Sequence, residues 1–145
     1  MLNIPIKLLD TELPAPAYAH PGDAALDIRS TISGTLEPGE RQLVPCGFAL
    51  ALPEGYAALV IPRSGLAAKH GISVVNAPGL IDSGYRGEIK VSLVNLDSDQ
   101  AFSFERGDRI AQLMIIPVPA VRLQCADELP SSDRGVQGFG SSGLQ

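Results

Sequence analysis

Residues 44–52 read VPCGFALAL, and large apolar side chains occupy every second position of this stretch. A period of two places one apolar face of an extended strand against a core, with the smaller residues on the other face. Residues 4–8, 89–93 and 102–104 repeat the pattern more briefly. The sequence therefore predicts one long strand over residues 44–52 and several shorter strands elsewhere.

Turn-forming sequences separate the apolar runs at EPG (37–39), PEG (53–55), DSD (97–99) and RGD (106–108). Glycine and proline supply the backbone geometries that turns need, and the chain has 15 Gly and 12 Pro among 145 residues. Frequent breaks between short strands are typical of an all-β sandwich or barrel. The length and the apolar content of 45% fit one domain with its own core.

The overall composition excludes several classes of partner. Aromatic residues make up 5% of the chain, with no Trp, and stacking platforms for single-stranded nucleic acids need more of them. The formal net charge of −5 repels a polyphosphate chain at long range. Any phosphate ligand is therefore expected to be small and held by a few local Arg or Lys side chains.

The sequence gives no sign of membrane insertion or export. Its apolar runs fall short of the roughly 18 residues that a membrane span requires, and the start, MLNIPIKLLD, does not resemble a signal peptide. Cys46 and Cys125 lie far apart, and neither has another Cys or a His at metal-ligand spacing. We therefore expect free thiols in a cytoplasmic protein.

One segment is predicted to be helical, and its start could bind an anion. Ser64 can cap a short helix that Gly71 ends. Ser64 and Gly65 would then offer free backbone N–H groups beside the charge of Arg63, which suits a phosphate. The alternative is an ordinary helix cap next to a surface arginine.

Residues 76–88 predict a hairpin folded around a pocket. Asp82 follows an apolar pair in this segment and is a candidate general base, or simply an aspartate that stabilises a turn. Tyr85, three residues later, could equally be a core aromatic. Asp27 lies on a probable strand, where a carboxylate is disfavoured, and it could face solvent or pair with an arginine.

Residues 130–145, PSSDRGVQGFGSSGLQ, hold too few large apolar side chains to order themselves and predict a flexible tail. We place the boundary of the folded domain after residue 129. The tail matches the dinucleotide-binding pattern G-x-G-x-x-G at 138–143, but no strand precedes it, so a Rossmann site is excluded.

Five stretches, in this order, resemble the five motifs of the trimeric deoxyuridine triphosphatase (dUTPase) family. They are GDAALDI (22–28), PRSGLA (62–67), NAPGLIDSGYRGEI (76–89), RGDRIAQL (106–113) and RGVQGFGSSG (134–143). Two residues depart from the family pattern, since Ala25 stands where Gly is usual and Gly84 where Asp is frequent. The resemblance implies a distorted jelly-roll or β-barrel subunit and a homotrimer whose sites are shared between subunits.

The resemblance also implies a reaction, in which dUTP and water give dUMP and pyrophosphate with Mg²⁺. This activity would limit uracil in DNA and supply dUMP for thymidylate synthesis. Asp82 would be the base that activates water, and Asp27 would reach the metal through water. The substrate-binding residues would be Arg63, Ser64, Gly65, Asn76, Gly79, Ile81, Tyr85, Lys90 and Gln112, with Arg134, Phe139, Gly140, Ser141 and Ser142 from the tail.

Within this set, Asn76 and the surrounding backbone would read uracil, while Tyr85 would exclude a 2′-hydroxyl. In the tail, Phe139 would stack on the base. Two alternatives stay open at this point: an enzyme related to dCTP deaminases, and a non-catalytic nucleotide-binding regulatory module.

Overall fold

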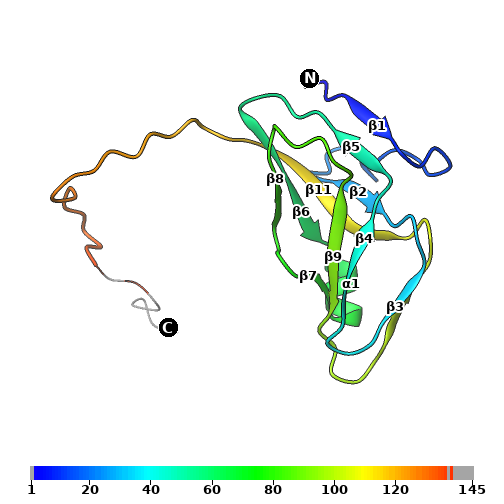
Figure 1. The fold of residues 1–145 in the computed structure, drawn as a ribbon. Coiled ribbons are helices and arrows are strands. Elements are labelled where there is room, and N and C mark those ends of the chain that lie inside the picture. Colours follow the sequence, from blue (N-terminus) through cyan, green and yellow to red (C-terminus); the bar gives the residue numbers. More distant parts are fainter. Residues whose placement is uncertain (1, 137, 139–145) are drawn as a thin grey trace.

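The computed structural model describes residues 2–136 and 138 (Figure 1). Within those residues the chain forms eleven strands and one helix, α1 (Ser64–His70). The strands are β1 (Ile6–Leu8), β2 (Leu26–Arg29), β3 (Gly34–Leu36), β4 (Arg41–Pro45), β5 (Phe48–Leu50), β6 (Tyr56–Pro62), β7 (Ile72–Val74), β8 (Gly79–Ile81), β9 (Lys90–Asn95), β10 (Phe102–Phe104) and β11 (Arg109–Pro117). The prediction of a mostly β protein with one short helix is confirmed.

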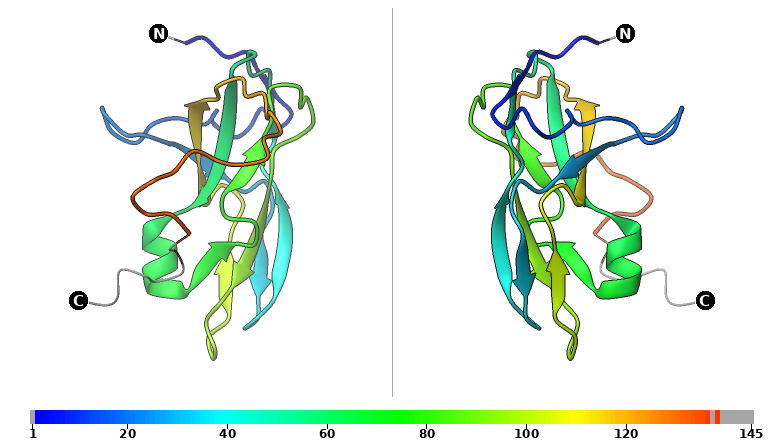
Figure 2. Two further views of the ribbon diagram at one scale, coloured as in Figure 1. Left: turned by 90° about the vertical axis from the view of Figure 1, so that its left-hand side faces the viewer. Right: turned by 90° about the vertical axis from the view of Figure 1, so that its right-hand side faces the viewer.

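Two antiparallel sheets form most of the fold. One has four strands in the order β2-β11-β6-β8, and the other has three in the order β4-β9-β7. The pairs β1-β5 and β3-β10 complete the topology. Figure 2 shows the strands as two layers with α1 beside one end of them. In the four-stranded sheet β11 pairs with β6 from Ala111 opposite Pro62 to Pro117 opposite Tyr56.

The core lies between the two layers and follows the alternation of the strands. Val91 and Leu93 of β9 are fully buried, whereas Lys90 is exposed. Ala111 and Leu113 of β11, which is in the other sheet, belong to the same hydrophobic cluster. Each large aliphatic side chain buried in this way contributes about 1.5–3 kcal/mol, so the core needs no disulfide.

The predicted single strand over residues 44–52 is wrong, because the chain breaks at Gly47. Gly47 has a φ of +72°, and a Cβ there would lie 2.7 Å from the Thr31 methyl carbon and 2.8 Å from the Asp10 Cβ. Its carbonyl accepts hydrogen bonds from the backbone N–H groups of Leu9 and Asp10, at 2.8 and 3.0 Å. The close approach of the N-terminal segment thus divides the stretch into β4 and β5.

The predicted helix is present, but Ser64 does not cap it. Arg63 is the N-cap residue, no side chain caps the helix there, and Ser64 is the first helical residue. Gly71 ends the helix as predicted, with a φ of +65°. Its N–H donates to the Ala67 carbonyl, which satisfies one of the acceptors that a helix end leaves free.

Residues 118–136 follow β11 without forming a helix or a strand, and they run away from the two sheets (Figure 1). Val118 is still attached to the body, because its N–H donates to the Gly55 carbonyl at 2.8 Å. Among the described residues no helix is long and apolar enough to cross a membrane. Residue 137 and residues 139–145 lie outside the described part of the chain.

Cys46 supplies a test of this core. Both cysteines are free, as predicted; Cys46 is buried and Cys125 is exposed. Burial, and secondarily the charge of Glu88, raises the pKa of the Cys46 thiol to about 12. Because the thiolate is the reactive form, we expect Cys46 to resist a maleimide at pH 8 in the native protein and to react in denaturant. Mass spectrometry of peptides identifies the labelled thiol, and rapid native labelling of Cys46 would contradict the fold.

Candidate functional site

Asp27 of β2 is the centre of a polar cluster on the four-stranded sheet. Its direct cross-strand partner on β11 is Gln112, whose Nε2 lies 3.5 Å from Asp27 Oδ1. Arg63, at the end of β6, places its Nε 3.6 Å from the same oxygen. The Asp27 side chain is only 11% exposed, so these neighbours fix its position. The alternative that Asp27 faces open solvent is wrong.

A β-bulge adds Arg109 to this cluster. Residues 109 and 112 would face opposite sides of a regular strand, but the register between β11 and β2 shifts between Arg109 and Ala111. As a result Arg109 Nη1 lies 3.0 Å from Asp27 Oδ2. Arg63 Nη1 in turn donates to the Arg109 carbonyl at 2.9 Å. Two guanidinium groups and one carboxylate therefore share a small surface.

The start of α1 adjoins this surface through Arg63. Ser64 and Gly65 form the first turn and are exposed, and the first turn carries no acidic residue. Backbone N–H groups in a first helical turn have no partners within the helix, so they are available to a ligand. Together with Arg63 and Gln112 they can accommodate an anion.

A second group of candidate residues lies around the segment after β8. A cavity of about 310 Å³ is lined by Leu43, Leu80, Ile81, Asp82, Tyr85, Glu88, Ile89 and Lys90. Four of the predicted site residues thus share one cavity, which combines apolar walls with the carboxylate of Asp82. A concave site with mainly apolar walls and a few polar groups is typical of small-molecule binding.

The predicted hairpin over residues 76–88 is confirmed, because the strands on either side of it, β7 and β9, pair antiparallel from Ile72 opposite Asn95 to Val74 opposite Leu93. Within this segment β8 leaves the hairpin and pairs with β6 of the other sheet. Residues 82–90, from the end of β8 to the first residue of β9, form a loop, which we call the 82–90 loop. Its first turn is closed by the N–H of Tyr85, which donates to the Asp82 carbonyl at 3.1 Å.

Tyr85 is held against the backbone of its own loop. Its hydroxyl donates to the Glu88 carbonyl at 3.0 Å. A Cβ on Gly87 would lie 2.6 Å from Tyr85 Cζ, so only glycine leaves room for the ring there. Tyr85 is 47% exposed, which contradicts the alternative of a core aromatic.

Asn76 and Gly79 lie at the other end of β8. Gly79 is buried on β8, and a Cβ there would meet Asn76 Nδ2 and Val60 Cβ, both at 3.3 Å. The absence of a side chain at residue 79 therefore lets the Asn76 amide approach the strand. The peptide bond between Ala77 and Pro78 is cis.

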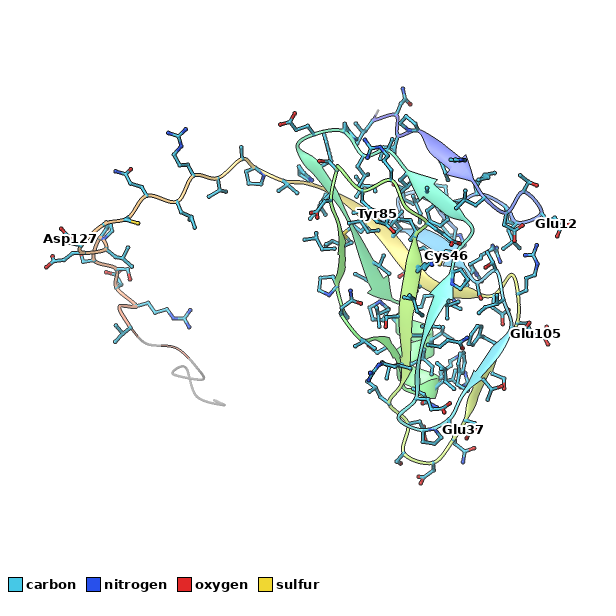
Figure 3. All side chains as sticks on the ribbon, in the orientation of Figure 1. Glu12, Glu37, Cys46, Tyr85, Glu105 and Asp127 are labelled. Carbon is cyan, nitrogen blue, oxygen red and sulfur yellow. The ribbon has the colours of Figure 1, made fainter. Side chains whose placement is uncertain are left out.

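The two groups of residues do not meet within one chain. Ile81 pairs with Ala58 of β6, five residues before Arg63, which corresponds to about 16 Å along a strand. Tyr85 lies near the upper end of the sheets in Figure 3, whereas α1 lies at the lower end in the same orientation (Figure 1). One chain thus presents an anion-suited surface and an acid-bearing cavity at separate places.

The tail residues are only partly described. Arg134 is exposed in a turn, and the N–H of Gly135 donates to the Ser132 carbonyl at 3.0 Å. Phe139, Gly140, Ser141 and Ser142 lie outside the described residues. Their predicted contacts with a ligand stay predictions.

Sequence reasoning missed two residues of the site. Arg109 lies in the RGDRIAQL stretch (106–113), but no role is predicted for it from the sequence. Residues 109 and 112 face opposite sides of a regular strand, and the bulge that brings them to the same side cannot be recognised in the sequence. Glu88 received no role either, although it lines the cavity. An acidic residue directly before the buried Ile89 was the available signal for it.

The fold and the site together define a class of protein, in which a β-sheet domain carries a cationic surface for phosphates and an acid-bearing, partly apolar cavity. The family model described as dUTPase matches residues 11–143. The chain therefore belongs to the dUTPase family.

Individual relatives agree with this assignment. A deoxyuridine 5′-triphosphate nucleotidohydrolase of Streptomyces avermitilis is 57% identical over 142 residues, which cover 98% of this chain and 81% of the relative. The corresponding protein of Leifsonia xyli is 57% identical over 128 residues, 88% of this chain and 84% of that protein.

Two solved structures of similar proteins are described with a bound ligand or a metal ion. A variant of the Staphylococcus bacteriophage 80alpha dUTPase with dUpNHpp has a TM-score of 0.91 and 30% identity, covering 99% of this chain and all of that one (100%). A variant dUTPase of phage phi11 of S. aureus, whose description names a structural Mg(II) ion, has a TM-score of 0.82 and 26% identity, covering 90% of this chain and 100% of that one.

Proposed function

We propose that this protein hydrolyses dUTP to dUMP and pyrophosphate. Membership of the dUTPase family supports the reaction class. The observation that carries the proposal is the cavity that both Asp82 and Tyr85 line. This arrangement places a proton acceptor beside a surface that fits a nucleoside. A regulatory module that only binds a nucleotide would not require the proton acceptor.

In the proposed mechanism Asp82 orients a water molecule and takes its proton as the water oxygen attacks the α-phosphorus. The new P–O bond forms while the bond from the α-phosphorus to the bridging oxygen breaks, and pyrophosphate leaves. Arg63, Gln112 and the first-turn N–H groups at Ser64 and Gly65 hold the phosphates. Positioning and charge stabilisation of this kind supply most of the catalysis in phosphoryl transfer.

We propose that Mg²⁺ accompanies the phosphates and that Asp27 reaches it through water. No cluster of three or more His, Cys, Asp or Glu side chains occurs in the described part of the chain. A single carboxylate fits Mg²⁺, which commonly binds one or two carboxylates plus substrate phosphates and keeps several waters. The bound ion would neutralise phosphate charge, while Asp27 balances the nearby Arg63 and Arg109.

Base and sugar recognition are assigned to Asn76, to the strand β8 that follows it and to the loop after β8. The Asn76 amide and the backbone at Gly79 and Ile81 would match the hydrogen-bonding edge of uracil. Tyr85 would pack against the deoxyribose and leave no space for a 2′-hydroxyl. Lys90 lines the cavity and is exposed, so its ammonium group is available to a phosphate.

We propose that the active unit is a homotrimer with sites shared between subunits. The separation of Arg63 from Asp82 within one chain supports this, because one nucleotide must contact both. Leu43 and Leu80 at the cavity are 59% and 63% exposed, which leaves apolar surface for a second subunit to cover. The tail from residue 130 would close over the bound nucleotide, with Arg134 and Ser141 and Ser142 adding phosphate contacts.

We also propose that the protein works in the cytoplasm. The support is the free state of Cys46 and Cys125, which suits a reducing compartment.

Asp82→Asn tests the proposed base. We expect the variant to bind a non-hydrolysable imido analogue of dUTP as the parent does, while kcat falls by roughly 10²- to 10⁴-fold because proton abstraction is lost. Pyrophosphate release measures turnover. Asp99→Asn makes the same chemical change on an exposed loop and should retain full activity; turnover by Asp82→Asn within a few-fold of the parent would refute the assignment.

Tyr85→Ala and Tyr85→Phe test the sugar filter. The alanine variant removes the ring and is expected to narrow the ratio of kcat/KM between dUTP and UTP. The phenylalanine variant keeps the ring but loses the hydrogen bond from the hydroxyl to the Glu88 carbonyl, so we expect it to lose less discrimination than the alanine variant, though not to match the parent. An unchanged ratio in the alanine variant would place the filter on another residue.

Mixed trimers test the shared site. Asp82→Asn and Arg63→Ala are each expected to give an almost inactive homotrimer. After the two variants are unfolded and refolded together, a site can combine an intact 82–90 loop from one chain with an intact Arg63 from another. Random assembly should restore about a quarter of the sites. Light scattering checks the trimer, and a mixture no more active than its components would show that each site belongs to one chain.

A further inference from the structure

Glu88 connects the 82–90 loop to the turn between β4 and β5. Its neighbour Ile89 bonds on both sides of Gly47: the Cys46 N–H donates to the Ile89 carbonyl at 3.1 Å, and the Ile89 N–H donates to the Phe48 carbonyl at 2.8 Å. Gly47 is the extra residue between these two bonds, so its N–H has no carbonyl opposite it. Glu88 Oε1 accepts that N–H at 3.0 Å.

This contact is costly to lose. Gly47 is buried, and a buried backbone N–H without an acceptor is strongly unfavourable. The acceptor is a carboxylate, and hydrogen bonds to ionised groups are roughly twice as strong as neutral ones. The Glu88 charge is also close enough to the buried thiol to raise the pKa of Cys46, after burial itself. Figure 3 shows Cys46 and Tyr85 in this part of the protein.

The main chain of the same residue holds Tyr85. The Glu88 carbonyl accepts the Tyr85 hydroxyl at 3.0 Å, and the ring lies over Gly87. The Glu88 side chain therefore anchors the residue whose carbonyl locates the ring. If the anchor is removed, the hydrogen bonds described within the loop before Ile89 are local ones, such as those from Arg86 Nη1 to the Ser83 and Tyr85 carbonyls.

We infer that Glu88 is a positioning residue for Tyr85 and, through it, a determinant of the preference for deoxyribose over ribose. The inference rests on the proposed function, in which Tyr85 excludes the 2′-hydroxyl. Glu88 does not contact the reacting atoms. Its effect should therefore be found in the comparison of dUTP with UTP rather than in the turnover of dUTP alone.

Three substitutions separate this role from simple loss of structure. Glu88→Gln keeps an oxygen acceptor at the same distance and is expected to preserve selectivity. Glu88→Asp keeps the charge but is one methylene too short to reach the Gly47 N–H, and Glu88→Ala removes the acceptor altogether. For Asp and Ala we expect the dUTP/UTP ratio of kcat/KM to fall by up to about tenfold, which is the fall if the whole cost of one unpaired buried donor is expressed in the position of Tyr85.

Glu40→Ala is the matched control. Glu40 Oε2 accepts the Glu37 N–H at 2.9 Å, which is the same kind of carboxylate-to-backbone bond on an exposed turn. This variant should leave the dUTP/UTP ratio unchanged. An equal fall in Glu40→Ala, or an unchanged ratio in Glu88→Asp and Glu88→Ala, would overturn the inference. A loss of selectivity in Glu88→Gln equal to that in Glu88→Asp would also overturn it.

Fluorescence measures the position of Tyr85 without any substrate. The chain has no Trp and three Tyr, so Tyr18→Phe with Tyr56→Phe leaves Tyr85 as the only strong fluorophore. In this background Glu88→Asp should increase quenching of Tyr85 by acrylamide, whereas Glu88→Gln should not. Equal quenching in both would overturn the positioning role. Turnover of dUTP by the parent, measured in the same series, tests the proposed function separately.

Discussion

The antiparallel pairing of β6 with β11 is the interaction on which both parts of the site depend. It runs from Tyr56 opposite Pro117 to Pro62 opposite Ala111. At its lower end β6 delivers Arg63 to the surface where β11 presents Gln112, and β2 on the far edge of β11 adds Asp27. On the other edge of β6, β8 carries the chain upward to Asp82. If the pairing of β6 with β11 slipped by one residue, every side chain of β6 would turn to the other face of the sheet. The polar cluster around Asp27 and the cavity beside Asp82 would then both be lost.

The charge of the cluster explains how a protein with net charge −5 holds a triphosphate. Arg63 and Arg109 are concentrated around one carboxylate, so attraction is local, while the overall charge repels longer polyanions. Asp27 offsets part of the arginine charge. In the proposed complex a triphosphate with Mg²⁺ would bring both signs of charge, which suits a surface that also has both.

Local sequence patterns predicted what local physics decides. The helix after Arg63 ends at Gly71 because glycine adopts the left-handed conformation there, and the alternation in β9 matches its buried face. Two features escaped prediction because distant segments cause them. The break at Gly47 comes from the approach of Thr31 and Asp10, and the bulge at Arg109 comes from pairing with β2. Family resemblance supplied candidate roles for Asp82 and Tyr85 but none for Glu88. The inferred role of Glu88 depends on its hydrogen bond to Gly47, which lies 41 positions earlier in the chain.

The division of the site between two places on one chain links activity to assembly in the proposed trimer. The sheets and the core are complete within a single chain, since the buried cluster draws on both layers without a partner. In the proposed trimer the nucleotide site would be completed only between chains, because Arg63 and the 82–90 loop lie at different ends of β6. Folding and site formation would then be separate steps with different dependences on concentration: the first is unimolecular, whereas the second follows mass action. Substitutions at the subunit boundary would therefore lower activity at low enzyme concentration while leaving the fold of each chain intact, and substitutions in the core would affect both at every concentration.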